Sequence, residues 1–319
     1  MVSIPSNLLK SGKDYPSNWD QFIRWFPDHE ACLQFLSKLR WPSGFCCPRC
    51  YQHAEPYHLS RGRLLCRSCR YQATVTSGTL FDKSRTSLTN WFAAAWYITN
   101  EKHGVSALGL QRLLGLGSYQ TAWTMLHRYR QAMVDPSRDK LTGTVEVDET
   151  YVGGADKGCS RAPSLTSKKA IVAIAVELKQ PKGFGRIRLK RIEEATQKTL
   201  NRFVCDSVEQ STVIRTDGSS IYRKLPELGY CWDKHVLLGS IEPAHETLVG
   251  VHRVASLLKR WLLGTHQGSV NLEHLDAYLN EYAFRFNRRK SRSRGLLFFR
   301  LLELAVNTPP IKYKDVKIS

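Results

Sequence analysis

The stretch TGTVEVDETYVGG, residues 142–154, decides how the rest of the chain is interpreted. Its apolar and polar residues alternate as in a half-buried β-strand, and the run ends in two glycines. Glu146, Asp148 and Glu149 fall within this strand, although the whole chain carries a formal net charge of +19. A basic protein that concentrates acid on one strand is typical of a site that holds a metal ion.

The residues that follow predict the other strands of a sheet. An almost continuous apolar run and a second alternating segment form a β-meander with the first strand. A helical segment, a strand that ends at Asp217, another short strand and two long helices complete the pattern. The further strands are expected at 168–179, 184–195, 211–222 and 233–238, and the helices at 195–208, 248–264 and 271–290. We therefore expect an α/β fold, a mixed sheet with helices on its faces, in the manner of RNase H.

The two aspartates of this sheet are candidate metal ligands. In the expected topology Asp148 lies in the middle strand and Asp217 ends the adjacent strand, so both carboxylates can point into one cleft. Such oxygen ligands suit Mg²⁺ or Mn²⁺, and two ions could clamp the attacking and leaving oxygens of a phosphodiester. Two plainer interpretations remain open: a surface strand around Asp148 and an ordinary turn at the TDGS of 216–219.

Four cysteines nearer the N-terminus form two tight pairs. Cys47 and Cys50 form one C-x-x-C motif, and Cys66 and Cys69 form the second. Two such knuckles supply the four thiolates that a structural Zn²⁺ prefers, and the segment between them suits the short strands of a zinc ribbon. Cys46 could compete as a ligand with poorer spacing, and a redox role is the alternative for the pairs. A site with four cysteines is closed, so this zinc would organise structure and take no part in catalysis.

Residues 86–134 are expected to be helical. Ser87 or Thr89 can cap an apolar helix, and Ser106 can cap a short helix that ends near Leu114. A glycine turn and a second helix follow, in the order of a helix-turn-helix DNA reader, although an ordinary helical hairpin fits the same pattern. The candidate DNA contacts on the second helix are Tyr119, Gln120, Arg128 and Arg130.

The composition favours a polyanionic partner. The chain has 319 residues, with 47 Lys and Arg against 28 Asp and Glu. Such an excess spread over a folded chain is typical of nucleic-acid binding, and a merely basic protein is the alternative. No secretory signal and no stretch of 18 apolar residues is visible, so we expect a cytoplasmic, nucleoid-associated protein without a membrane segment.

Together these motifs resemble the DDE-type transposases of bacterial insertion sequences, specifically the ISXO2-like group with an N-terminal zinc ribbon. The resemblance covers roughly residues 20–305, and the motifs occur in family order. It implies an RNase H-like core that binds two Mg²⁺ or Mn²⁺ ions, nicks the ends of the element and joins the freed 3′ hydroxyls to target DNA. The motifs are FCCPRC with CRSC, TSGTLFDKSRTSL, VEVDETYVGG, RTDGSSIY, LKRWLLGTHQG and YAFRFNRRKSRSRGLLFFRLL.

The resemblance also implies roles for single residues. Asp148 and Asp217 match the first and second catalytic aspartates, whereas the third acidic position of many members is His252 here. Histidine can bind a divalent ion, so we expect His252 as the third catalytic ligand, with Glu246 and a damaged site as the rivals. Further residues are expected to meet DNA phosphates, namely Lys259 and Arg260, and then the run of Arg285, Asn287, Arg288 and Arg289, for which a solvated helix end is the alternative.

The expected organisation has four parts: an N-terminal helical segment (1–40), the zinc ribbon (41–76), a helical DNA-binding region (77–138) and the catalytic domain (139–310). The partner is double-stranded DNA, comprising element ends and target, and a homodimer or larger assembly is expected because two ends must meet. Two other functions stay open: an RNase H-like nuclease that cuts without joining, and a catalytically inactive DNA-binding protein derived from a transposase.

Overall fold

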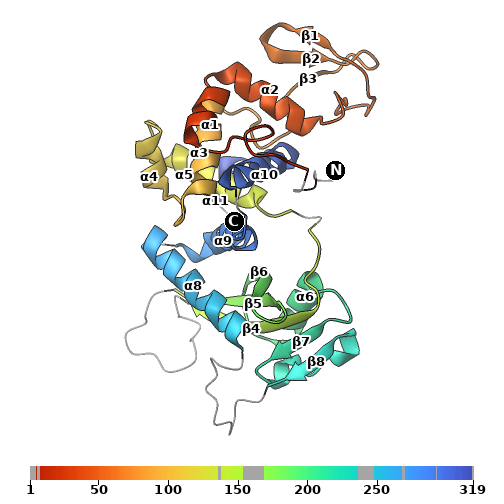
Figure 1. Ribbon diagram of the computed structural model, residues 1–319, viewed down its shortest axis with the longest axis vertical. Helices are drawn as coiled ribbons and strands as arrows, with labels where there is room; N and C mark the ends of the chain where they lie inside the picture. The colour runs from red at the N-terminus through yellow and green to blue at the C-terminus, as the bar shows by residue number, and fades with distance from the viewer. Residues whose placement is uncertain are drawn as a thin grey trace. The chain divides into compact units, whose positions relative to one another are not determined.

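The chain divides into two compact units. The computed structural model describes residues 5, 8–135, 138–153, 169–235, 248–267, 270–291 and 293–317. Unit 1 combines the chain up to residue 135 with the segment from residue 290 onward, and unit 2 comprises residues 136–289. Figure 1 labels the helices and strands of both units. The C-terminal helices therefore belong with the N-terminal unit, which differs from the expectation of a catalytic domain that runs to residue 310.

A small antiparallel sheet in unit 1 carries the two cysteine pairs. Its strands β1 (Tyr57–Leu59), β2 (Arg63–Leu65) and β3 (Gln72–Thr74) are ordered β1-β2-β3. Arg40 ties this sheet to a neighbouring helix, because its Nη1 donates to the carbonyl oxygens of Thr74 and Val75 at 2.9 and 2.8 Å. The short strands agree with the expected zinc ribbon.

Polar side chains fix where the helices of unit 1 begin. Asn18, Asp28, Ser87, Ser106 and Ser118 each accept a hydrogen bond from a backbone N–H of the first turn, as expected for Ser87 and Ser106. The helices are α1 (Trp19–Trp25), α2 (His29–Arg40), α3 (Leu88–Asn100), α4 (Ala107–Leu113), α5 (Tyr119–Ala132), α10 (Arg294–Asn307) and α11 (Tyr313–Lys317).

Aromatic rings form the core of unit 1 and explain why α10 belongs to it. Phe298 of α10 packs against Phe22, Phe26 and Phe92 with ring centroids 5.5 to 5.9 Å apart. Gly295 lets the N-terminal segment cross α10 closely, since a Cβ there would collide with the backbone of Pro16. These contacts join α10 to helices that lie far from it in the sequence.

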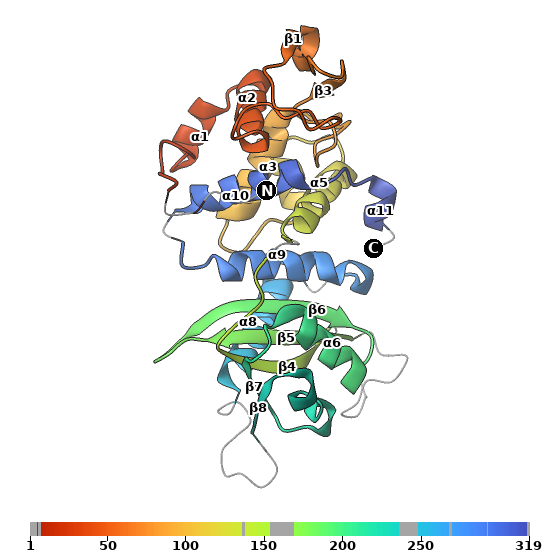
Figure 2. The same ribbon diagram turned by 90° about the vertical axis from the view of Figure 1, so that its right-hand side faces the viewer.

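Unit 2 is built on a five-stranded mixed sheet ordered β6-β5-β4-β7-β8, whose strands lie one above another in Figure 2. Strands β4, β5 and β6 are antiparallel, whereas β7 runs parallel to β4 and β8 parallel to β7. This is the expected RNase H-like arrangement. The strands are β4 (Thr144–Val152), β5 (Ala170–Leu178), β6 (Phe184–Ile192), β7 (Val213–Thr216) and β8 (Cys231–Lys234). Strand β8 begins two residues before the predicted segment, whose end lies outside the described residues.

Helices cover both faces of this sheet. Val172 and Ile174 of β5 pack against α8 (Val249–His266) and α9 (Leu275–Asn287), whereas Ala173 of the same strand faces α6 (Gln197–Ser207) on the other side. The alternation follows from the two-residue period of a strand. The short 3₁₀ helices of the chain are η1 (Ser60–Gly62), η2 (Ser220–Tyr222), η3 (Pro226–Leu228) and η4 (Leu272–His274).

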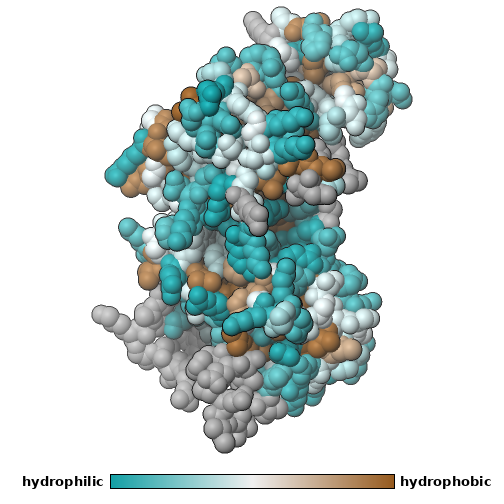
Figure 3. All heavy atoms as spheres, in the orientation of Figure 1, coloured by the Kyte–Doolittle hydropathy of each residue, from teal (hydrophilic) through white to brown (hydrophobic). Residues whose placement is uncertain are grey.

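The surface is mainly hydrophilic on the face shown in Figure 3, with apolar residues in scattered groups. Within the part of the chain that the structure describes, no helix has the length and apolarity needed to cross a membrane.

A largely buried carboxylate joins β5 to β6. Glu177 accepts hydrogen bonds from the backbone N–H groups of Thr142 and Arg186 at 3.0 and 2.8 Å, and it pairs with the Arg186 guanidinium at 2.6 Å. Burial alone would raise the pKa of Glu177, but the hydrogen bonds from Arg186 outweigh it and hold the pKa below its ordinary value.

We expect Glu177→Gln to reduce the stability of the protein by about 1–3 kcal/mol at neutral pH, because two buried donors lose a charged acceptor. Since the pKa of Glu177 is lowered on folding, its contribution is present above the ordinary value of about 4.5 and is lost as the pH falls through the folded value. Urea unfolding of the wild type and the variant between about pH 3 and 7 measures this. Equal stabilities at neutral pH would contradict it.

Candidate functional site

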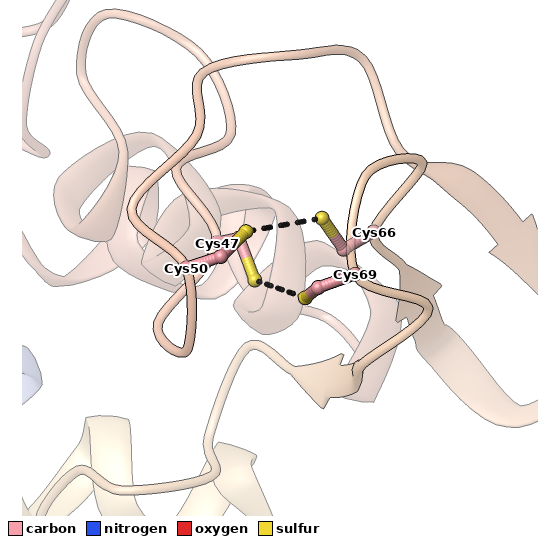
Figure 4. Close-up of side chains that lie close together, drawn as sticks. All are labelled: Cys47, Cys50, Cys66 and Cys69. Carbon is pink, nitrogen blue, oxygen red and sulfur yellow. Dashed lines mark hydrogen bonds between the residues drawn. The ribbon is translucent and has the colours of Figure 1, made fainter.

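The four predicted cysteines converge in the zinc ribbon. Cys47 Sγ lies 3.6 Å from Cys69 Sγ, and Cys50 Sγ lies 3.7 Å from Cys66 Sγ, as Figure 4 shows. All four sulfurs lie within 4.8 Å of one another. A tetrahedron with Zn–S bonds of about 2.3 Å has edges of about 3.8 Å, so the donor set fits a structural Zn²⁺. Cys46 is not part of this set, and its thiol faces the carbonyl of Tyr51 at 3.7 Å.

Two matching turns bring the cysteine pairs together. The N–H of Tyr51 donates to the carbonyl of Cys47, and the N–H of Arg70 donates to the carbonyl of Cys66. Tyr51 and Arg70 each follow the second cysteine of a pair and adopt a left-handed φ of 57° and 59°. Hydrogen bonding from the Cys69 backbone lowers the pKa of the Cys66 thiol to about 6. A thiolate, which is the form that binds zinc, is therefore available at neutral pH.

The sheet of unit 2 brings Asp148 and Asp217 together. Strand β4 pairs in parallel with β7, with Glu146 opposite Arg215, so the residues two positions further along are Asp148 and Asp217. Burial raises the pKa of Asp148 to about 7, and the nearby charges of Glu149 and Asp217 add to this effect. No ion pair in the described ranges involves either aspartate. Carboxylates that repel one another in a partly buried site fit a divalent cation, which would neutralise them.

Two neighbours orient these acids, and sequence reasoning missed one of them. The Tyr222 hydroxyl donates to Glu149 Oε2 at 3.2 Å, and burial together with the charges of Glu149 and Asp148 raises the pKa of Tyr222 well above its ordinary value. Asp217 Oδ1 accepts the backbone N–H of Ser219 at 3.0 Å, which fixes the turn after β7. The TDGS segment is thus both a turn and the end of the strand that brings Asp217 beside Asp148. The only signal for Tyr222 is its place in the RTDGSSIY motif.

The structure does not group His252, the expected third ligand, with Asp148 and Asp217. His252 lies on the first turns of α8 and is half-buried. Among the residues that the structure describes, the four cysteines are the only group of three or more His, Cys, Asp or Glu side chains close enough to hold an ion. Glu246, the rival of His252, lies outside the described residues.

Glu146, which precedes Asp148 by two residues on the same strand face, holds α8 in place. Its carboxylate accepts the backbone N–H of Val251 at 3.0 Å, although it is only 2% exposed. Leu248, the residue at the helix start, provides no side-chain cap. The Glu146 carboxylate, which comes from β4, takes the place of that cap. Burial raises the pKa of Glu146, and the backbone hydrogen bonds from Val251 and Gly250 work in the opposite direction. Glu146 therefore caps and positions α8, the helix that carries His252.

The residues of α8 and α9 and those just after α9 that were expected to meet DNA divide into two groups. Lys259 and Arg260 of α8 are exposed. Asn287 instead bonds both the N–H and the carbonyl of Ile187 at 2.7 and 3.2 Å, and Arg289 donates to the carbonyls of Phe184 and Gly185. These two half-buried side chains bond to the free edge of β6, which gives them a structural role within unit 2.

The remaining two residues of that run also have partners within unit 2. Arg288 packs over the ring of Phe284, with Cζ 4.0 Å from the ring centroid. The Arg285 side chain is 11% exposed and lies 3.9 Å from the carboxylate of Glu281. Both therefore have a structural role before any contact with DNA.

The residues expected to read DNA on α5 also divide. Tyr119 and Gln120 are exposed at the start of the helix. Arg128 is half-buried, with Cζ 6.0 Å from the ring centroid of Trp91. Arg130 is 1% exposed, which leaves it no surface for a phosphate and corrects its assignment. The helix is amphipathic, and the sequence alone did not show that Arg130 lies on its buried side.

Comparisons with known proteins agree with this geometry. Residues 140–287 match the ISXO2-like transposase domain, and residues 27–72 match the transposase zinc-ribbon domain. A relative from Halobacterium salinarum, described as an uncharacterized protein in transposable element ISH50, is 27% identical over 290 residues, which cover 86% of this chain and 95% of the relative.

We expect Asp148→Asn to stabilise the protein in the absence of divalent ions. The folded-state pKa of Asp148 is raised from 3.8 to about 7, so ionisation opposes folding as the pH rises through this window. Above it, the variant should gain roughly 1–3 kcal/mol. Thermal unfolding at about pH 8 with and without Mg²⁺ measures this, and Mg²⁺ should raise the Tm of the wild type more than that of the variant. A lower Tm for the variant without Mg²⁺ would contradict the prediction.

We expect Gly250→Ala to destabilise unit 2 by about 1–3 kcal/mol, because the new Cβ overpacks the cap. It would lie 2.7 Å from Glu146 Oε2 and 3.2 Å from a Leu178 methyl carbon. Gly264 of the same helix is the matched control, since a Cβ there meets nothing within 4 Å. Gly264→Ala should stabilise by about 0.5–1 kcal/mol through helix propensity. Chemical unfolding of both variants decides the matter, and equal effects would refute the cap.

Proposed function

Since the chain carries a transposase zinc ribbon followed by an ISXO2-like transposase domain, we propose that it cuts DNA at the ends of an insertion sequence and joins the freed 3′ hydroxyls to target DNA. This makes it a polynucleotidyl transferase of the DDE type. The observation that carries the proposal is the position of Asp148 on β4 beside Asp217, which directly follows β7, with the pKa of Asp148 raised by burial and by the carboxylates beside it.

Asp148 and Asp217 would hold two Mg²⁺ or Mn²⁺ ions, with His252 as the third ligand. Such an ion activates water or a 3′ hydroxyl as nucleophile and neutralises charge on the phosphodiester. Glu149, whose carboxylate accepts a hydrogen bond from the Tyr222 hydroxyl, keeps the acidic part of β4 oriented. Glu146 holds the first turn of α8 and with it the position of His252. Lys259 and Arg260, further along α8 and exposed, bind the phosphates of the strand being cut.

DNA recognition falls to unit 1 in this proposal. The zinc ribbon and the helical region bind the element ends, and α5 contributes Tyr119 and Gln120 from its exposed start. Because two ends have to be brought together, the active form is a homodimer or larger assembly on double-stranded DNA. The protein then works at the nucleoid.

A strand-transfer assay tests the proposal. Purified protein is incubated with a labelled element-end duplex and a plasmid target, in the presence of Mg²⁺, Mn²⁺ or EDTA. Joined product that requires the metal is expected for the wild type, and Asp148→Ala and Asp217→Ala should lower it by at least about a thousandfold. Cleavage without joining would indicate a nuclease. Tight binding without either reaction would indicate a catalytically inactive DNA-binding protein derived from a transposase.

The ligand role of His252 needs its own variants in that assay. His252→Ala should abolish joining, whereas His252→Glu should restore part of it, because a carboxylate is a harder ligand for Mg²⁺. Full activity of His252→Ala beside inactive aspartate variants would remove His252 from the site and make Glu246 the next position to replace.

A further inference from the structure

A small basic groove lies on unit 1, between the segment after the zinc ribbon and the first half of α5. Its volume is about 270 Å³, and its lining includes Lys83, Arg85 and Arg128. No aspartate or glutamate lines it. None of the three cations forms an ion pair in the part of the chain that the structure describes. Three unneutralised positive charges around a cavity call for an anionic ligand.

The wall that carries Lys83 and Arg85 is held firmly. Ser84 Oγ accepts hydrogen bonds from Trp91 Nε1 at 2.8 Å and from the backbone N–H of Thr86 at 3.1 Å. Trp91 is itself 1% exposed. Lys83 has a left-handed φ of 50°, a conformation that persists only where the surrounding contacts require it. The segment is therefore preorganised and presents its two cations to the groove at little further cost in entropy.

Arg128 supplies an unsatisfied donor on the opposite wall. Its Nε atom is buried and has no hydrogen-bond partner among the described residues. Burial lowers the pKa of Arg128 from its ordinary value. A buried guanidinium donor without an acceptor is unfavourable, and an anion that enters the groove would satisfy it.

The start of α5 adds to the positive potential of the groove. Gln120 and Thr121, both in the first turn, line it. Ser118 caps the helix, and the first turn contains no acidic residue, so its positive end is not neutralised. Phosphate groups of DNA bind at such helix starts when basic side chains surround them.

We propose that this groove binds a backbone phosphate of double-stranded DNA, gripped by Lys83, Arg85 and Arg128, and thereby sets the start of α5 against the bases. The inference rests on the proposed action of the chain on DNA. It adds Lys83 and Arg85 to the DNA-binding residues and gives Arg128 a defined ligand. The groove lies just below the about 300–1,000 Å³ of small-molecule sites, and its charged walls suit a phosphodiester better than an apolar ligand.

Fluorescence anisotropy of the full zinc-loaded chain tests the groove. The probe is a fluorescein-labelled duplex of mixed sequence, titrated at several salt concentrations without divalent ions. Lys83→Gln with Arg85→Gln should weaken binding roughly tenfold and reduce the slope of log K against log salt by about 2. The control, Lys10→Gln with Lys38→Gln, removes the same charge from exposed positions of unit 1 outside the groove and should change the affinity less than about twofold.

Gln120→Glu separates a binding defect from a folding defect. The acid lies in the first turn of α5, where it should preserve or raise the Tm, yet it should repel a phosphate and weaken binding. Equal affinities of the groove variants and the control would overturn the proposal. Displacement of the duplex by millimolar inorganic phosphate, beyond the effect of matched ionic strength, would also overturn it in favour of a free-anion site.

The proposed catalytic function fails separately, because this assay contains no divalent ion and detects binding alone. Groove-dependent binding without strand transfer would leave the groove in place and remove the catalysis. If the wild type performs strand transfer but the groove variants bind DNA as well as the control does, the catalytic function stands and the groove proposal fails.

Discussion

The central position of β4 is the constraint on which unit 2 depends. The strand lies between β5 and β7, so both of its edges are paired, and helices pack on both faces of the sheet. Val145 and Val147 belong to the core beneath α6, and Glu146 and Asp148 point to the face covered by α8 and α9. A buried carboxylate on such a strand needs donors, and the free N–H groups at the start of α8 supply them to Glu146. One strand therefore builds a core, positions a helix and carries an acidic site.

The acidity of this strand is costly without a cation. Burial, together with the charges of Glu149 and Asp217, raises the pKa of Asp148 to about 7. Arg215 of the adjacent strand, which lies opposite Glu146, pairs with Asp233 at 3.0 Å, and His235 lies 3.2 Å from the same carboxylate oxygen. In the part of the chain that the structure describes, these positive side chains therefore pair with Asp233 and not with Asp148 or Asp217.

Local patterns allowed much of this structure to be predicted. The cysteine spacing gave the zinc site because each knuckle closes within a few residues, and the two-residue period of the strands gave the sheet. Charge runs were less informative, because charge does not show which way a side chain points. Asn287 and Arg289 cover the edge of β6, and Arg130 is buried. Which unit α10 joins depends on the contacts of Phe298 with distant rings, and no local pattern encodes these.

Glu146 and Asp148 also show how one strand can separate two jobs that both need a carboxylate. The two residues share a strand face, so each could in principle serve the metal. Glu146 Oε2 already accepts the N–H of Val251, and the space beside Gly250 that this oxygen fills leaves no room even for a methyl group. If the Glu146 side chain turned away to bind an ion, the start of α8 would lose its cap. Within the described ranges, Asp148 accepts a hydrogen bond only from the N–H of its own neighbour Glu149. The difference in hydrogen bonding, rather than in residue type, therefore gives the first acid a structural role and leaves the second available for the ion that we propose.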